Sequence, residues 1–249
     1  MAVHLYGVTA SAGPHPSEVK GRADVPVRLV GDDELSVIVS DIDAAAPAGR
    51  KDLMAHARVL ESYVEQATVV PIQFGIALPD DDTVHEQVLK HDRQSLVELL
   101  HFFDGVVQLT VQASHHEQPA LREVLRRDPG LLALRDQLQD TADPSNRDRQ
   151  IELGQGVAEG LQQLQEEDAT LILERLAPLA QAVSENDASG LREVLNAAFL
   201  VDRDSRPDFD AAVGALRELV EHRVRLRYVG PQPPYSFLEP ARSGELAWG

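Results

Sequence analysis

Hydrophobic residues recur along this chain at two different spacings, and each spacing predicts a different element. Alternation of apolar and polar residues predicts half-buried strands, whereas recurrence every three to four residues predicts helices with one apolar face. The predicted strands cover residues 3–9, 25–30, 35–42, 68–72, 106–113, 183–186, 194–201 and 225–229. The predicted helices cover residues 52–67, 80–103, two short segments within 117–139, 145–180, and a segment opened by Pro207.

The order of these elements predicts an α+β protein with two domains. Strands and helices alternate through residues 1–103, which we expect to form an N-terminal α+β domain. Counted from Val106, the order becomes strand, helices, strand, strand, helix, strand. That order is typical of a ferredoxin-like split βαβ domain, here modified by inserted helices. Residues 104–249 are therefore expected to form a second domain that carries a long helix and a proline-rich terminal arm.

Proline spacing makes the end of the chain distinctive. Three prolines and a glycine follow the last predicted strand and remove backbone donors, so the strand is expected to stop at Gly230. An extended, polyproline-like arm should follow, and its aromatic residues should make it fold back onto the body of the protein. Pro231 and Pro234 also form a Pro-x-x-Pro pattern that polyproline-reading domains recognise, although structural packing is the better explanation because the prolines directly follow a strand. The candidate residues of this arm are Gly230, Pro231, Pro233, Pro234, Tyr235 and Phe237.

Composition narrows the possible partners. The chain has 23 Lys and Arg residues against 41 Asp and Glu residues, a formal net charge of −18, and this field would repel a nucleic acid backbone. Cysteine is absent, which excludes disulfides and suits a cytoplasmic protein. No apolar run approaches the ~20 residues of a membrane span, so we expect no membrane partner.

Several motifs suggest chemistry, but each has a structural explanation. Gly154, Gly156 and Gly160 resemble a dinucleotide loop, yet no strand precedes them and they interrupt a helical pattern. His115-His116-Glu117 is the densest group of potential metal ligands, but it follows a strand where a solvated loop is expected.

The other candidates are carboxylates and one histidine. The aspartates at 80–82 suit the start of a helix, and Glu166-Glu167-Asp168 suits a solvated helix face, although Asp168 also interrupts the apolar seam and suggests a bend or a polar contact. His56 is expected to be partly buried and hydrogen-bonded. We therefore predict no catalytic residues, no metal and no cofactor.

The terminal arm also carries a family resemblance. Gly230-Pro-Gln-Pro-Pro-Tyr-Ser-Phe237 resembles the terminal signature of the gas vesicle accessory proteins of the GvpF/GvpL family, which usually reads Gly-Pro-Trp-Pro-Pro-Tyr-Ser-Phe. Gln232 replaces the usual tryptophan, and Gln73 stands where the family more often has arginine. The segments 4–8, 70–75 and 195–201 agree with the family in order, so the resemblance spans nearly the whole chain.

The resemblance implies a function that composition alone does not. Such proteins are minor components of gas vesicles within the cytoplasm, without enzymatic activity, and they bind the small hydrophobic major shell protein and other accessory proteins during nucleation. The segment with Pro71, Phe74 and Gly75 and the terminal arm are the candidate partner-binding surfaces, and either could instead be internal packing. Arg122, Arg126 and Arg127 are either a docking face for another accessory protein or ordinary solvated arginines. The alternative function is a small-molecule-binding or enzymatic ferredoxin-like protein.

Overall fold

The computed structural model describes residues 2–13, 15, 19–43, 47–139, 146–186, 190 and 192–243. Contacts between Cα atoms divide the chain into two compact units. The first comprises Met1–Leu109, Leu200–Asp204 and Val229–Gly249, and the second comprises Thr110–Phe199 and Ser205–Tyr228. The terminal segment is thus grouped with the N-terminal residues, and the domain boundary near residue 103 stays a prediction.

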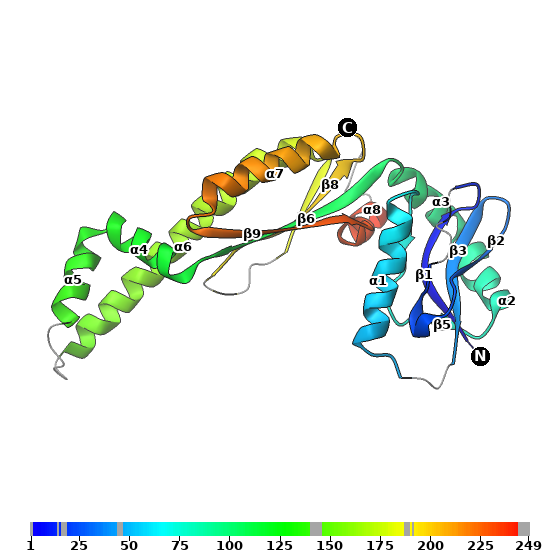
Figure 1. Ribbon diagram of the computed structural model, residues 1–249, viewed down its shortest axis with the longest axis horizontal. Coiled ribbons are helices and arrows are strands. Elements are labelled where there is room, and N and C mark those ends of the chain that lie inside the picture. The colour runs from blue at the N-terminus through cyan, green and yellow to red at the C-terminus, as the bar shows by residue number, and fades with distance from the viewer. Residues whose placement is uncertain are drawn as a thin grey trace. The chain divides into compact units, whose positions relative to one another are not determined.

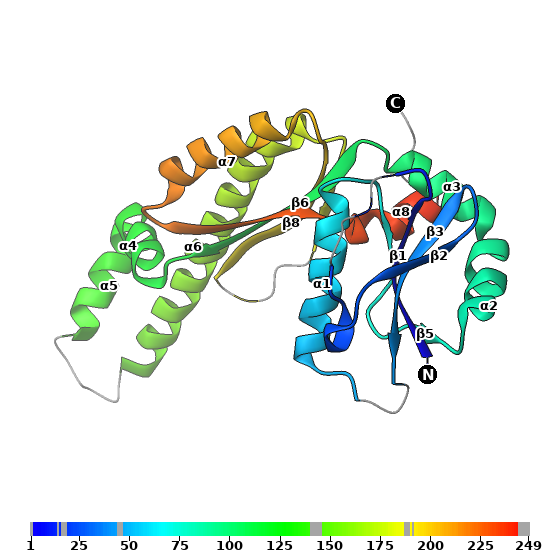
Figure 2. The same cartoon turned by 45° about the vertical axis from the view of Figure 1, so that its right-hand side comes forward.

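A five-stranded antiparallel sheet forms the centre of the first unit. Its strands are β1 (Ala2–Ala10), β2 (Arg28–Gly31), β3 (Leu35–Ile42), β4 (Val70–Pro71) and β5 (Ala77–Leu78). The order is β2-β3-β1-β4, and β5 also pairs with β1. Helix α1 (Arg50–Val64) covers one face, while α2 (Asp81–Val84) and α3 (Arg93–Phe102) lie on the other (Figures 1 and 2). Residues 2–9 of β1 are consequently buried on both faces.

Helix α1 buries only part of the apolar face that its sequence predicts. Leu60 and Val64 are at most 3% exposed, as the spacing requires. Leu53 shares this spacing but is 48% exposed, because it lies near the start of the helix and outside the core. The helix begins where the Asp52 carboxylate accepts a hydrogen bond from the Gly49 backbone N–H at 3.0 Å. The amphipathic pattern is confirmed, and Leu53 is left at the surface.

The second sheet has the strand order of a ferredoxin-like fold. Its strands are β6 (Val106–His115), β7 (Ala182–Glu185), β8 (Glu193–Asp202) and β9 (Val224–Gln232), and the order is β7-β8-β6-β9. The first and third strands of the βαββαβ unit are thus central, which confirms the predicted fold class. Helices α6 (Arg147–Leu176) and α7 (Arg206–Val220) lie on one side of the sheet (Figures 1 and 2). Phe199 of β8 and Phe209 of α7 pack with ring centroids 5.2 Å apart.

Three predicted elements differ from the observed ones. The helix expected over residues 80–103 is divided into α2, a π-helical segment (His85–Lys90) and α3, because the backbone leaves helical geometry at Asp92. The last strand continues to Gln232, although Pro231 donates no ladder hydrogen bond, so its predicted stop at Gly230 is wrong. The arm is not extended either, because Tyr235–Phe237 forms a 3-10 turn that leads into α8 (Leu238–Ser243).

The two inserted helices, α4 (Glu117–Arg127) and α5 (Pro129–Gln139), pack on α6 beside its glycines. A Cβ atom built on Gly160 would lie 2.5 Å from Val124 Cγ1, and one built on Gly156 would lie 2.4 Å from Leu131 Cδ2. Ala120, Val124 and Leu164 form the buried cluster at this contact. Two glycines of the pattern that resembles a dinucleotide loop, Gly156 and Gly160, therefore form a helix-packing surface. Among the described helices, none has the length and apolar character needed to cross a bilayer.

Gly154 and Gly160 offer a matched pair for testing this packing. Nothing lies within 4 Å of a Cβ built on Gly154, so Gly154→Ala should stabilise the protein by about 0.5–1 kcal/mol through helix propensity. Gly160→Ala should instead destabilise it by about 1–3 kcal/mol relative to Gly154→Ala, because the stiff Val124 side chain must move. Urea denaturation followed by circular dichroism would measure both changes, and equal stability of the two variants would contradict the close helix contact.

Candidate partner-binding site

The terminal segment is docked on the first unit, as its aromatic residues predict. Phe237 is 1% exposed, and the Ser236 backbone N–H donates to Gln108 Oε1 at 3.0 Å. Pro233 and Pro234 are also buried, and α8 contacts α3. These contacts show that the segment is part of the fold of the first unit.

The tyrosine of the tail reaches the second candidate segment. Tyr235 Oη donates to the backbone oxygen of Ile72 at 3.1 Å and lies 3.3 Å from His56 Nε2. Ile72 lies between Pro71 and Phe74, which the sequence marks as possible partner-binding residues. The terminal segment and the segment around Ile72, which are about 160 residues apart in sequence, are therefore in contact next to His56 of α1.

A pair of buried histidines supports this contact. His4 Nε2 lies 3.1 Å from His56 Nδ1, and His56 Nε2 lies 3.1 Å from the Ile72 oxygen. A carbonyl oxygen can only accept, so His56 carries its proton on Nε2, and His4 Nε2–H then donates to His56 Nδ1. The expectation that His56 is buried and hydrogen-bonded is confirmed.

Burial keeps both histidines uncharged at neutral pH. It lowers the pKa of His4 to about 4, with further lowering by the neighbouring His56 and by the Arg22 guanidinium. Burial also lowers the pKa of His56, against the opposing hydrogen bond to Ile72, and raises the pKa of Tyr235 to about 12. The hydrogen-bonded chain from β1 to the tail is thus made of neutral groups.

A hollow of about 250 Å³ lies where α1, the 71–75 segment and the tail meet. Its lining residues are Leu53, His56, Ala57, Leu60, Glu61, Gln73, Phe74, Gln232, Pro233 and Tyr235. Of the predicted site residues, Phe74, Pro233 and Tyr235 therefore lie together at one surface feature. Leu53, Ala57 and Leu60 are not among the predicted site residues, but their spacing of three to four residues places them on one face of α1 and is the signal that they share a surface.

The remaining predicted site residues lie outside this hollow. Pro71 pairs with Gly7 in the sheet, and Pro234 and Phe237 are buried by the docked tail. Gly75 has a φ of 100°, which favours glycine, and Gly230 lies so close to Leu109 that a Cβ atom would meet it at 2.6 Å. Pro231 lies at the end of strand β9, next to its last residue, Gln232. Except for Gly75, which is exposed, their positions suit internal packing.

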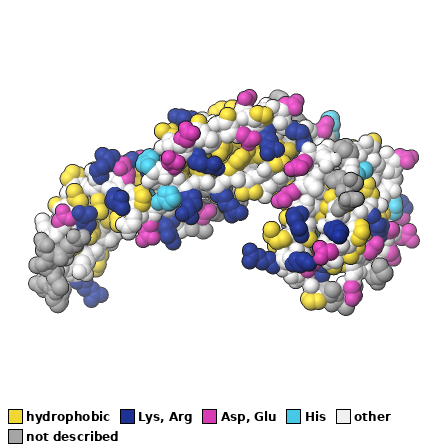
Figure 3. All heavy atoms as spheres, in the orientation of Figure 1, with side chains coloured by type: hydrophobic (Ala, Val, Ile, Leu, Met, Phe, Trp, Pro, Cys, Tyr) yellow, Lys and Arg dark blue, Asp and Glu magenta, His cyan; other side chains and the backbone are white. Residues whose placement is uncertain are grey.

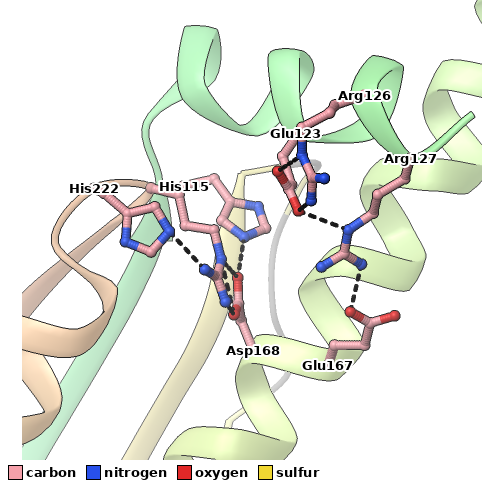
Figure 4. A network of polar contacts seen from close by, with 8 residues as sticks. His115, Glu123, Arg126, Arg127, Glu167, Asp168 and His222 are labelled. Atoms are coloured by element: carbon pink, nitrogen blue, oxygen red, sulfur yellow. Dashed lines mark hydrogen bonds and ion pairs between the residues drawn. The ribbon is translucent and has the colours of Figure 1, made fainter.

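A second polar constellation lies in the second unit and corrects two sequence interpretations (Figure 4). His115 is not in a solvated loop, because β6 extends to this residue and its side chain is 1% exposed. Asp168 is equally buried and is not part of a solvated helix face. His115 Nε2 lies 2.9 Å from Asp168 Oδ2, and Arg223 donates to both carboxylate oxygens. The polar contact suggested by the interrupted seam of α6 is confirmed.

Hydrogen bonding keeps this buried carboxylate charged. Burial opposes ionisation of Asp168, but the bonds from His115 and Arg223 outweigh it and lower the pKa of the carboxyl group below its usual value. The same contact raises the pKa of Arg223. Arg126 and Arg127 of the predicted basic face pair with Glu123, and Arg127 also pairs with Glu167 (Figure 4). Among the described residues, no group of three or more carboxylate and histidine ligands is placed to hold a metal.

The depressed pKa of His4 predicts a pH-dependent stability. The unfolded chain binds a proton at this position below about pH 6.5, whereas the folded chain does so only near pH 4, so stability should fall as pH decreases through this window. The contribution should reach roughly 3 kcal/mol, and His4→Gln should remove it. Urea titrations from pH 7 to pH 4 would measure it. His91→Gln, at an exposed position, is the control and should keep the wild-type slope.

Asp168 and Glu167 allow a comparison of buried and exposed charge. Asp168→Asn should destabilise the protein by about 3 kcal/mol, because it removes the negative charge that pairs with Arg223 and replaces one of the two accepting oxygens with an NH2 donor. Glu167→Gln removes a half-exposed partner of Arg127 and should cost less than about 1 kcal/mol. Thermal unfolding would compare the two variants, and a small effect of Asp168→Asn would show that the buried network contributes little.

Comparisons with known proteins identify the same family as the terminal signature does. The chain matches the family described as "Gas vesicle synthesis protein GvpL/GvpF" over residues 2–239. It is 36% identical to gas vesicle protein F of Streptomyces sp. (strain CB03234), over 96% of this chain and 100% of that protein. The crystal structures of GvpF from Anabaena sp. PCC7120 and Microcystis aeruginosa superpose with TM-scores of 0.79 and 0.75, each at 26% identity and over 95% of this chain and 98% of that structure. This chain therefore belongs to the GvpL/GvpF family of gas vesicle accessory proteins.

Proposed function

We propose that this protein is a minor assembly component of gas vesicles that binds the small hydrophobic shell protein, together with other accessory proteins, during vesicle nucleation. Its relatives are named gas vesicle proteins F and L, which supports a role in the same structures. The proposed location is the gas vesicle within the cytoplasm. The observation that supports binding of the shell protein is the hollow lined by Leu53, Phe74 and Tyr235.

This hollow offers apolar surface without an obvious internal use. Leu53 is 48% exposed and Tyr235 is 39% exposed, although both line a concave site with Phe74 and Leu60. Removing such surface from water contributes about 25 cal/mol per square ångström of apolar area, before the entropic costs of association are subtracted. Glu61 and Gln73 add polar groups at the same site. An apolar side chain or helix of the shell protein fits this combination.

The hollow is also held in shape before a partner arrives. Tyr235 is fixed by the Ile72 oxygen, and His56 is fixed by His4 and Ile72. Preorganisation of this kind reduces the entropy lost on binding. Both ring nitrogens of His56 are used in these bonds, which favours a binding surface over acid–base catalysis. We therefore propose a role without enzymatic activity.

The charge of the protein suits a carrier of an apolar subunit. Acidic and basic side chains are interspersed over the face that Figure 3 presents. The net charge of −18 thus acts as a general field, which keeps a protein soluble and opposes nonspecific association. A shell subunit bound at the hollow would share that protection, and its premature aggregation would be slowed.

Leu53 and Met54 are adjacent, similarly exposed residues that test the proposal. Leu53 lines the hollow, whereas Met54, which is 54% exposed, does not. Leu53→Glu should reduce co-purification of the shell protein at least tenfold, which corresponds to about 1.4 kcal/mol, because it places a charge in an apolar contact. Met54→Glu adds the same charge to the same helix and should retain capture. Equal capture by both variants would place shell binding elsewhere, and no capture by the unmodified chain would exclude direct binding.

A further inference from the structure

Strand β9 is the longer of the two edge strands of the second sheet. The strand order β7-β8-β6-β9 places β7 and β9 at the two edges, and β7 has 4 residues whereas β9 has 9. Among the described residues, no strand pairs with the outer edge of β9. An edge of this length presents backbone N–H and C=O groups that can bind another extended chain.

Two hydrogen bonds fix the register of β9 on β6. The His116 backbone N–H donates to the Arg223 oxygen at 2.8 Å, and Arg227 Nη1 donates to Gln112 Oε1 at 3.5 Å. The residue numbers therefore run in opposite directions along the two strands, which are antiparallel, and Gln112 lies opposite Arg227. In an antiparallel pair every second residue bonds its backbone to the same neighbour, so the series that contains Arg223 and Arg227 bonds to β6.

The alternate residues of β9 direct their backbone groups away from β6. Leu226 and Tyr228 belong to this second series, and their side chains face the helices, since the rings of Tyr228 and Phe209 of α7 have centroids 6.1 Å apart. Their backbone N–H and C=O groups point to the outer edge, where no described strand pairs with them. The edge thus offers donors and acceptors at two alternate positions, as strand addition requires.

The side chains of Arg225 and Arg227 give this edge a positive charge. They alternate with the residues that face the helices, so they lie on the face of the sheet opposite α6 and α7 (Figures 1 and 2). Both are exposed, and neither forms an ion pair in the part of the chain that the structure describes. Their Cα atoms are separated by about 7 Å along the strand, the spacing of two carboxylates at alternate positions of a neighbouring strand.

We infer that the outer edge of β9 binds an extended segment of a partner protein that carries Asp or Glu at alternate positions. The segment would bond its backbone to Leu226 and Tyr228 and place two carboxylates beside Arg225 and Arg227, because side chains directly opposite each other share one face of a sheet. A second copy of β9 is disfavoured, since it would place arginine against arginine. The inference goes beyond the proposed binding of the shell protein and uses none of the residues of that hollow.

Three capped heptapeptides test the inference on the full-length protein. The first, Thr-Glu-Val-Glu-Val-Glu-Thr, has alternating carboxylates, and Thr-Lys-Val-Lys-Val-Lys-Thr has lysine in their place. The third, Glu-Glu-Thr-Val-Val-Thr-Glu, keeps the composition of the first but has no two glutamates at alternate positions. The alternating acidic peptide should bind at least tenfold more tightly than either control by fluorescence anisotropy, because it alone pairs with both arginines while it extends the sheet.

Amide hydrogen exchange measured by NMR would locate the bound peptide. The amides of Leu226 and Tyr228 should exchange at least tenfold more slowly when the acidic peptide is bound, because they gain hydrogen-bond acceptors. The amides of Arg225 and Arg227 already bond to β6 and should change little, so they serve as the internal control.

A pair of double variants separates local charge from net charge. Arg225→Glu combined with Arg227→Glu should weaken binding of the alternating acidic peptide at least tenfold. Arg175→Glu combined with Arg217→Glu makes the same change in net charge at exposed positions of α6 and α7, and it should retain binding.

Four results would each overturn the inference: equal binding of the three peptides, binding without protection of the two edge amides, equal loss of binding in both double variants, or no binding at millimolar concentration. The peptide comparison and the exchange measurement use the unmodified chain, so they remain decisive even if a double variant does not fold.

Discussion

The burial of polar side chains on β1 is the constraint on which the first unit depends. His4 and Tyr6 are fully buried on this strand, and each must find a partner inside the protein. His56 of α1 meets His4, and Ser40 of β3 meets Tyr6 at 2.8 Å. The chain of bonds ends at the Ile72 oxygen, which Tyr235 also approaches. Docking of the tail thus continues a network that begins at the first strand.

The second unit also buries a polar side chain, but here the buried group is the ionised carboxylate of Asp168, which pairs with Arg223. Asp168 interrupts the apolar seam of a long helix, where an isolated carboxylate would be very costly. His115 at the end of β6 and Arg223 just before β9 converge on it, so one buried carboxylate connects a helix with two strand ends. The glycines of α6 have a complementary role, because they let α4 and α5 approach closely enough to bury Val124 and Leu164. Packing and charge pairing together hold the inserted helices in place.

Complementarity at the hollow beside α1 must come from apolar contact, because both ring nitrogens of His56 are already bonded. Leu53, Phe74 and Tyr235 supply that contact. A surface that selects by apolar shape suits a hydrophobic protein subunit.

The sequence by itself determined the elements whose signals are local. Apolar spacing located α1 and the long helix α6, and the order of strands and helices was enough for the ferredoxin-like class. The terminal motif was enough for the family. Only the tertiary structure decided that Leu53 stays exposed, that β9 passes through Pro231, and that His115 is the partner of Asp168. The physical reason is that spacing reports the face of an element, whereas burial and pairing depend on residues that are distant in sequence, such as the 53 positions that separate His115 from Asp168.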